Sequence, residues 1–175
     1  MIVETSRLIL REMTDDDFDA LYRVLADSDI MQHYPYTFDE ARVRNWIARN
    51  RERYRIFGFG LWAVILKETG TFIGDCGISL QPINGQWLPE VGYHINKAYW
   101  RQGYASEAAA ACIRLAFERF QYPAVYSYMN AANEPSWRTA MKNGMSLVTE
   151  YVDDHHGPLK VFSIDQSAWK KQCSR

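Results

Sequence analysis

The stretch with the clearest chemical potential runs from residue 90 to 108, where a short strand leads through a glycine turn into a helix. Apolar side chains alternate over residues 91–95, as they do in a strand with one buried face. Gly103 lets a ligand come close to the backbone because it has no Cβ. The helix that follows starts with Ala105 and Ser106, and the first turn of a helix presents unpaired N–H groups and a positive dipole end. This arrangement predicts a phosphate site.

The glycine turn by itself does not identify the phosphate ligand. Dinucleotide-binding loops need three spaced glycines, and P-loops need a Gly-Lys-Ser/Thr sequence. The chain contains neither pattern around Gly103. A glycine before a helix is also compatible with a simple turn. Whether it binds a ligand must therefore be inferred from the order of the elements around it.

The composition excludes several classes of protein. A chain of 175 residues is long enough for one domain with its own core. The formal net charge of −1 gives no reason to expect a nucleic acid or a membrane as main partner. The chain has no secretory signal and no apolar run that could span a bilayer. Its three cysteines are far apart, which fits reduced thiols in a cytoplasmic protein.

Hydrophobic periodicity and capping residues place the elements along the chain. Residues 82–89, which contain Asn84 and Gly85, are predicted to form a loop or turn. Strands are predicted at residues 7–11, 61–66, 71–78, 91–95, 125–129, 147–152 and 159–164. Helices are predicted from residue 14, from residue 37 to about 54, at 105–120, from residue 133 to a stop at Gly144, and after a cap at Asp165. Mixed strands and helices without a linker predict a single α/β domain, residues 1–175.

The second helix carries arginines along both borders of its apolar stripe. One border holds Arg42, Arg49 and Arg53, and the other holds Arg44, Arg51 and Arg55. Their stems can lie along the edge of a buried stripe while the guanidinium groups stay in water. The alternative is a basic rim for an acidic partner, or for RNA, which would show a steep salt dependence.

Four motifs in this order resemble the GNAT superfamily of acetyl-CoA-dependent N-acetyltransferases, and within it the RimJ/RimL-like group. The motifs are residues 5–11 (opening strand), 90–93 (central strand), 99–108 (pyrophosphate loop), and 133–136 with 142–145 (helix beside the pantetheine arm). The resemblance implies a mixed, α+β-like fold. Its central sheet would be twisted and mostly antiparallel, with about six to seven strands flanked by helices.

The resemblance also implies positions for the cofactor, acetyl-CoA. The backbone of Tyr93, His94 and Ile95 would pair with the pantetheine amides as an added strand does, and would donate to the thioester oxygen. Asn133 would hydrogen-bond the pantetheine arm. The pyrophosphate would be held by Arg101, Gln102, Gly103, Tyr104, Ala105 and Ser106.

Two side chains are candidates for proton transfer. Glu90 stands where the family often has its general base, and an acceptor ammonium must lose a proton before its nitrogen can attack. Ser136 matches a serine proposed to protonate the leaving thiolate. The alternatives are that Glu90 is an ion-pair partner and that Ser136 or Asn133 caps a helix. His94 is expected to be a structural histidine, and His155 and His156 lack the further ligands of a metal site.

Three positions depart from the family pattern: Trp100 replaces a usual Gln or Arg, Ala140 a thiolate-protonating tyrosine, and Met145 a frequent aromatic residue.

The resemblance implies transfer to a primary amine, in first place a protein or peptide N-terminus. A small-molecule amine and a non-catalytic acyl-CoA sensor are the alternatives. The acceptor pocket is expected from residues 33–38 and 152–160. Relatives are often dimers, so a homodimer stays an open alternative.

Overall fold

One sheet of eight strands forms the centre of the computed structural model, which describes residues 2–174. The strand order is β1-β2-β3-β4-β5-β6-β8-β7, and every neighbouring pair is antiparallel except β5 with β6. The predicted mixed α/β fold with a mostly antiparallel sheet is confirmed, with eight strands in place of about six to seven. The strands are β1 (Val3–Glu4), β2 (Leu8–Arg11), β3 (Leu61–Leu66), β4 (Phe72–Ile83), β5 (Gln86–Ile95), β6 (Ala124–Asn130), β7 (Ser146–Asp153) and β8 (Gly157–Asp165).

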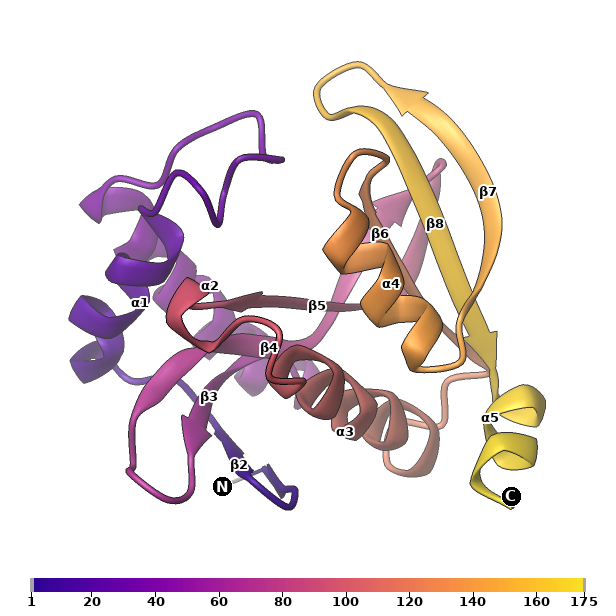
Figure 1. The fold of residues 1–175 in the computed structure, drawn as a ribbon, viewed down its shortest axis with the longest axis horizontal. Coiled ribbons are helices and arrows are strands. Elements are labelled where there is room, and N and C mark those ends of the chain that lie inside the picture. The colour runs from indigo at the N-terminus through magenta and orange to yellow at the C-terminus, as the bar shows by residue number, and fades with distance from the viewer. Residues whose placement is uncertain (1, 175) are drawn as a thin grey trace.

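Helices cover both faces of the sheet (Figure 1). They are α1 (Phe18–Leu25), α2 (Glu40–Phe57), α3 (Tyr104–Glu118), α4 (Glu134–Lys142) and α5 (Gln166–Cys173). Strand β3 shows how the two faces divide, since alternate side chains of a strand point to opposite faces. Leu61 and Ala63 join the core made with α1 and α2, whereas Trp62 and Val64 join the core made with α3. Each face of the sheet therefore has its own hydrophobic core.

Local signals in the sequence account for the helix boundaries. The Asp39 carboxylate accepts a hydrogen bond from the Arg42 N–H at the start of α2, and Gly58 ends this helix with a φ of 74°. Asp165 caps α5 in the same way. Such caps satisfy N–H groups that have no partner inside the helix. The predicted helices are confirmed, with ends that shift by a few residues.

The predicted loop or turn over residues 82–89 is a two-residue turn in the structure. Strand β4 continues to Ile83 and β5 begins at Gln86, with only Asn84 and Gly85 between them. Both turn residues have positive φ values, 47° and 79°. A two-residue turn of this kind matches the twist of paired strands, which is why the hairpin can run through residues that resemble a loop.

The connection that shapes the site runs from β5 through α3 to β6. These two strands are parallel, and their register is Glu90 opposite Tyr126. Beyond this point the strands separate, so residues 91–95 have no strand partner on the side that faces β6. The separation leaves backbone groups of the predicted cofactor segment available.

Two further features of the described residues bear on the sequence predictions. None of the helices among residues 2–174 combines the length and apolar character that a membrane crossing requires. Cys76 and Cys112 are buried, free thiols whose sulfur atoms are 3.6 Å apart. Burial raises the pKa of Cys76. Both thiols lie in the hydrophobic core.

Candidate active site

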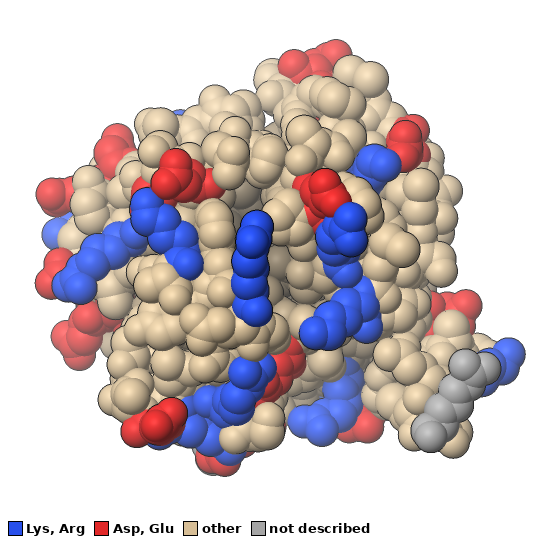
Figure 2. Space-filling view, viewed as in Figure 1, with Lys and Arg blue, Asp and Glu red and all other residues tan. Residues whose placement is uncertain are grey.

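A cavity of about 1200 Å³ lies where β5 and β6 separate. Figure 2 shows the same face of the molecule hollowed near its centre, with Lys and Arg side chains around the hollow. Every residue predicted for the site lines this cavity except Gln102. The side chain of Gln102 instead donates to the carbonyl of Ala98 at 3.2 Å. The cavity thus brings together residues of a strand, a turn and a helix, although Glu90 and Ser136 are more than 40 positions apart in the sequence.

The glycine turn presents the start of α3 to the cavity. Gly103 has a φ of 83° and Arg101 a φ of 60°, so the chain reverses sharply before the helix begins. Tyr104, Ala105 and Ser106 form the first turn of α3 and line the cavity. Their N–H groups precede the first intrahelical hydrogen bond, where an anion is favoured. The geometry fits the predicted pyrophosphate site.

A cluster that the sequence did not reveal holds this turn in place. Arg7 donates from Nη1 to the Gln102 carbonyl at 2.9 Å and from Nε to the Glu107 carboxylate at 2.7 Å. Thr5 and Ser6 also donate to Glu107, at 2.5 and 3.0 Å. Burial alone would raise the pKa of Glu107, but these hydrogen bonds lower it to about 2. Glu107 therefore anchors α3 to the segment that leads into β2.

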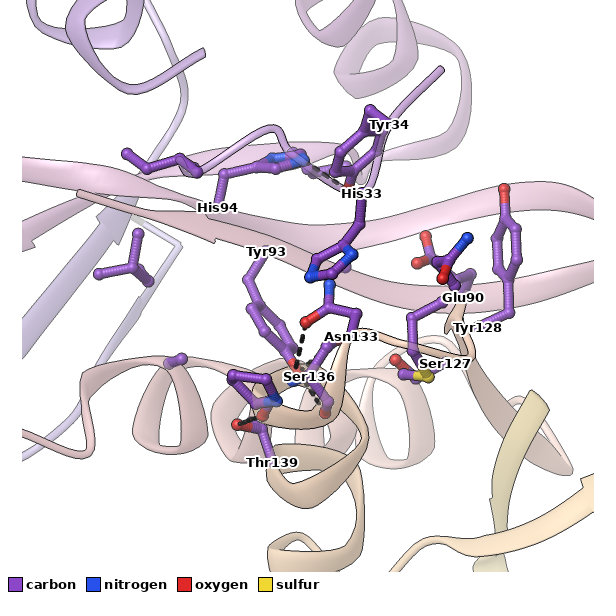
Figure 3. Close-up of a pocket in the computed structure, with 18 of the residues that line it drawn as sticks. His33, Tyr34, Glu90, Tyr93, His94, Ser127, Tyr128, Asn133, Ser136 and Thr139 are labelled. Carbon is purple, nitrogen blue, oxygen red and sulfur yellow. Dashed lines mark hydrogen bonds between the residues drawn. The ribbon is translucent and has the colours of Figure 1, made fainter. Parts of the chain in front are cut away.

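Strand β5 directs its side chains alternately to the two faces of the sheet. Tyr93 points towards α4, whereas His94 points to the opposite side and meets Tyr34 (Figure 3). Glu90 is an even number of residues from His94 and shares its face. The cavity therefore has a side with the glycine turn and α4, and a side with Glu90, His94 and α2.

Glu90 is a buried carboxyl group that accepts a hydrogen bond from a neighbouring strand. It is 9% exposed, and Ser79 donates to its Oε2 atom at 3.0 Å. A Cβ built on Gly92 would lie 2.9 Å from its Oε1 atom, so the absence of a side chain at Gly92 makes room for the carboxylate. Burial raises the pKa of Glu90 to about 7, although Ser79, His94 and Arg53 act in the other direction. A carboxyl group with this pKa can accept a proton near neutral pH and release it again.

His94 is part of a buried network, as the sequence predicted for a structural histidine. Its Nδ1 lies 2.8 Å from Asp75 Oδ1, and its Nε2 lies 2.8 Å from the Tyr34 hydroxyl. The Trp46 indole donates to the other oxygen of Asp75 at 2.8 Å. Burial would lower the pKa of His94, but the charge and hydrogen bond of Asp75 raise it. The imidazole is held in place and links α2 to β5.

The same network limits the predicted backbone donors. The backbone N–H of His94 donates to Asp75 at 3.1 Å. The carbonyl of Ile95 accepts from the Trp100 indole at 2.7 Å. The His94 N–H is therefore already engaged with Asp75 and is not free for the predicted donor role.

Helix α4 brings Asn133, Ser136 and the Tyr93 phenol together. Asn133 caps the helix, because its Oδ1 accepts from the Ser136 N–H at 3.3 Å. The alternative that Ser136 is the cap is therefore wrong. The Tyr93 hydroxyl donates to the Ser136 carbonyl at 3.0 Å and lies 3.3 Å from the Ser136 Oγ. Burial raises the pKa of Tyr93 to about 12, so the phenol stays protonated at neutral pH.

A comparison with family models decides the family. The model described as "Acetyltransferase (GNAT) domain" matches residues 7–146. The chain belongs to the GNAT acetyltransferase family. It is therefore an acyltransferase, and acetyl-CoA is the co-substrate that a GNAT domain uses.

Known proteins agree with this assignment. The chain is 37% identical to the "Uncharacterized protein YkkB" of Bacillus subtilis (strain 168) over 142 residues, which cover 81% of this chain and 83% of that protein. The GNAT-family acetyltransferase structure from Bacillus anthracis superposes with a TM-score of 0.81 at 26% identity and covers 94% and 98% of the two chains. RimL, titled a ribosomal L7/L12 alpha-N-protein acetyltransferase in complex with coenzyme A, has a TM-score of 0.76 at 16% identity, covering 95% and 98%. At that identity the likeness to RimL concerns the fold.

The three departures from the GNAT pattern now have a structural description. The Trp100 indole holds the Ile95 carbonyl, so it supports β5 from the pyrophosphate loop. Ala140 and Met145 are buried in the core between α3, α4 and the sheet. With alanine at position 140, the phenol nearest to Ser136 is supplied by Tyr93 from β5.

Residues expected to form the acceptor pocket line the same GNAT cavity. They include His33, Tyr34 and Tyr36 before α2, and Asp153, His155, His156 and Leu159 at the turn between β7 and β8. Among residues 2–174 the structure contains no group of three or more His, Cys, Asp or Glu side chains that could hold a metal ion.

Proposed function

We propose that this GNAT domain transfers an acetyl group directly from acetyl-CoA to a primary amine, and that the acceptor is the N-terminal amine of a protein or peptide. The observation that carries the proposal is the position of Glu90. Its buried carboxyl group, with a pKa of about 7, lines the same cavity as the glycine turn. It faces the side of the sheet opposite to that turn, so a base and a phosphate site approach one cavity from two sides.

The side with the glycine turn fits coenzyme A. Gly103 and the first turn of α3 offer N–H groups to a pyrophosphate, and Arg101 lies beside them in the cavity lining. The free edge of β5 offers backbone groups to the pantetheine amides. The Asn133 side-chain nitrogen makes no hydrogen bond to another described residue, so it can donate to the same arm.

Each proton in the transfer has a residue to move it. Glu90 accepts a proton from the acceptor ammonium, directly or through a water molecule, which frees the nitrogen lone pair for attack. Bound acetyl-CoA supplies the thioester whose C–S bond breaks as the new C–N bond forms. Backbone N–H groups of β5 stabilise negative charge on the carbonyl oxygen. Ser136 donates a proton to the departing sulfur, and the second proton, which the nitrogen loses after attack, returns through water to Ser136, whose Oγ lies 3.3 Å from the Tyr93 hydroxyl.

The acceptor class is supported by similarity alone. The motifs resemble the RimJ/RimL-like group, and RimL, which is titled an alpha-N-protein acetyltransferase, shares the fold. The residues that line the acceptor side of the cavity are mostly aromatic or polar and include Tyr34, Tyr36 and Tyr128. Such a lining is compatible with a peptide backbone.

The test is a thiol-release assay with acetyl-CoA and a panel of amines, followed by mass spectrometry of the products. We expect acetylation of peptide N-termini to exceed that of small amines such as polyamines and aminoglycosides. The reverse order would assign a small-molecule acceptor. Binding of acetyl-CoA by calorimetry without turnover of any amine would favour a non-catalytic sensor and overturn the proposal.

Glu90→Gln tests the mechanism within this assay. We expect kcat to fall by about 100-fold or more, since general base catalysis contributes about 10²–10⁴-fold, while the Kd for acetyl-CoA stays nearly unchanged. In the unchanged protein kcat should rise with pH through about 7, as the carboxyl group loses its proton. Glu68→Gln, at an exposed turn position outside the cavity, is the matched control. Equal turnover of the Glu90 and Glu68 variants would remove Glu90 from the mechanism.

A further inference from the structure

Two arginines of α2 face the acceptor side of the cavity without a carboxylate partner. We propose that Arg49 and Arg53 bind an anionic group of the acceptor, so that the enzyme prefers a primary amine with a carboxylate close to it. This inference rests on the proposed function, because it names the chemical class of acceptor for the same site. The sequence offered a basic rim for an acidic partner along both borders of α2 as an alternative. The inference narrows this rim to Arg49 and Arg53.

The first observation is where the pair lies. Arg49 and Arg53 are four residues apart on α2, so they occupy the same side of the helix. Both line the cavity that Glu90 also lines. Helix α2 covers the face of the sheet to which the side chains of Glu90 and His94 point, as the Trp46–Asp75–His94 contacts show. An acceptor whose amine reaches Glu90 therefore passes this pair.

The second observation is that the other arginines of α2 are already engaged. Arg44 pairs with Glu40, Arg51 with Asp15 and Arg55 with Glu52, at 3.9, 2.7 and 2.6 Å. Arg42 lies over the Tyr36 ring at 4.9 Å. Among residues 2–174, neither Arg49 nor Arg53 has a carboxylate within 4.0 Å. The unpaired guanidinium groups are confined to the border of α2 that faces the cavity.

The pair is electrostatically unfavourable as it stands. Like charges four residues apart on a helix repel each other. Arg53 is half-buried, and burial, followed by the charge of Arg49, lowers its pKa, whereas the charge of Glu90, which lies more than 4.0 Å away, acts in the other direction. Its contact with a neutral partner is a long one, 3.5 Å to the Asn50 side-chain oxygen. An anion between the two guanidinium groups would relieve both the repulsion and the loss of hydration.

The protein itself does not supply that anion. Besides Glu90, the carboxylates in the cavity lining are Asp29, Glu134 and Asp153. Asp29 pairs with Lys97 and Glu134 with Arg138, and Asp153 lies 2.8 Å from the His156 Nδ1. Glu90 is bonded to Ser79 and is reserved for the amine proton. A ligand with both an amine and a carboxylate would complement Glu90 and the arginine pair at once.

Coenzyme phosphates are a poor match for the pair. The glycine turn and the start of α3 lie on the other face of the sheet, and the cations that line the cavity there are Arg101, Lys142 and Arg138, the last of which pairs with Glu134. Arg49 and Arg53 belong to the helix layer on the opposite face. The ligand with which they interact is therefore the acceptor.

The experiment compares acceptors that differ in one charge. One arm uses C-terminally amidated peptides that begin with Ser and carry Asp, Asn or Lys at the second position. The other arm uses free amino acids against their amides, which separates a small carboxylate source from an acidic side chain. We expect kcat/KM for the acidic member to exceed that for its neutral counterpart at least about tenfold in one arm, the size expected for charge-assisted hydrogen bonds.

Variants then assign this preference to the pair. Arg49→Ala and Arg53→Ala should bring the acidic-to-neutral ratio towards one, and the double change Arg49→Glu with Arg53→Glu should favour the Lys peptide. Arg51→Ala, on the other border of α2 and paired with Asp15, should keep the ratio. Circular dichroism and an unchanged Kd for acetyl-CoA show that each variant is folded.

Two results would overturn the inference while leaving the proposed function intact: equal kcat/KM for acidic and neutral acceptors, or a preference that survives the double substitution. If coenzyme binds but no amine is acetylated, the proposed function fails. The anion site is then tested by measuring peptide binding instead of turnover. Calorimetry with the N-acetylated Asp and Asn peptides should then show tighter binding of the acidic one, abolished by the double substitution. Equal binding of the two peptides would overturn the anion site.

Discussion

The phenol oxygen of Tyr93 lies 3.3 Å from the hydroxyl oxygen of Ser136, and the phenol donates to the Ser136 carbonyl at 3.0 Å. The contact joins β5, which carries the predicted cofactor backbone, to the first turn of α4. Position 140, where many relatives have a tyrosine, holds a buried alanine. The strand therefore supplies the phenol that the helix lacks.

Replacing Tyr93 with Phe should slow turnover through Ser136. We expect kcat to fall about tenfold, a modest share of what a positioned proton donor contributes, with the Kd for acetyl-CoA nearly unchanged. Ser136→Ala should lower kcat by at least as much. If the two hydroxyls act as a unit, the double variant should be no slower than Ser136→Ala alone. Steady-state thiol release at saturating substrates measures this, and additive losses would show that Tyr93 only packs against α4.

Glu90 should make the protein less stable at alkaline pH. Its pKa is about 7 in the folded protein, above the ordinary value of 4.5. Between pH 4.5 and about 7, the folded protein therefore keeps a proton on Glu90 that the unfolded chain has already released. The associated stabilisation is complete below pH 4.5 and is lost as pH rises through about 7. At pH 8, Glu90→Gln should raise the free energy of unfolding by up to about 3 kcal/mol, at about 1.4 kcal/mol per unit of pKa. Urea titrations at pH 5 and 8 check this, and an equal effect at both values would contradict it.

Most of the fold followed from signals that are local in the sequence. Hydrophobic alternation, capping residues such as Asp39 and Asp165, and the turn at Gly103 each depend on a few adjacent positions. The predicted elements and the cavity-lining residues 93–95, 101 and 103–106 are therefore where the sequence indicated. For residues 82–89 the sequence predicts a loop or turn, but turn residues do not show how far the two strands pair on either side of Asn84 and Gly85.

Contacts between distant segments could not be read from one sequence. Arg7 and Glu107 are 100 residues apart, and Tyr93 and Ser136 are 43 apart. Their meeting depends on strand register and on how α3 and α4 pack, neither of which leaves a local pattern. The same holds for α2, where the helical spacing placed the arginines on two borders but did not show which border meets carboxylates.

The cluster around Glu107 should stabilise the fold in a pH-dependent way. Hydrogen bonds lower the pKa of Glu107 to about 2, below the ordinary 4.5, so its stabilisation is present above pH 4.5 and is lost as pH falls through about 2. At pH 7, Glu107→Gln should lower the free energy of unfolding by about 1–2 kcal/mol, less than the full shift would give because water screens Arg7. The difference should vanish near pH 2. Glu118→Gln, exposed on the same helix, is the control; equal losses in both variants would contradict the role of the cluster.

Gly103→Ala should weaken coenzyme binding through the backbone of the turn. Gly103 has a φ of 83°, and a Cβ there would lie 3.4 Å from Arg7 Nη2, close to the start of α3. Gly70 has a similar φ of 68° but no atom within 4 Å of a built Cβ. Alanine at either position should lower the free energy of unfolding by about 1 kcal/mol, the usual cost of a left-handed residue with a Cβ. Calorimetry should show a several-fold higher Kd for acetyl-CoA with Gly103→Ala and an unchanged Kd with Gly70→Ala. If both variants bind the coenzyme equally well, the glycine at position 103 serves the chain reversal alone, and the phosphate contacts must come from elsewhere in the cavity.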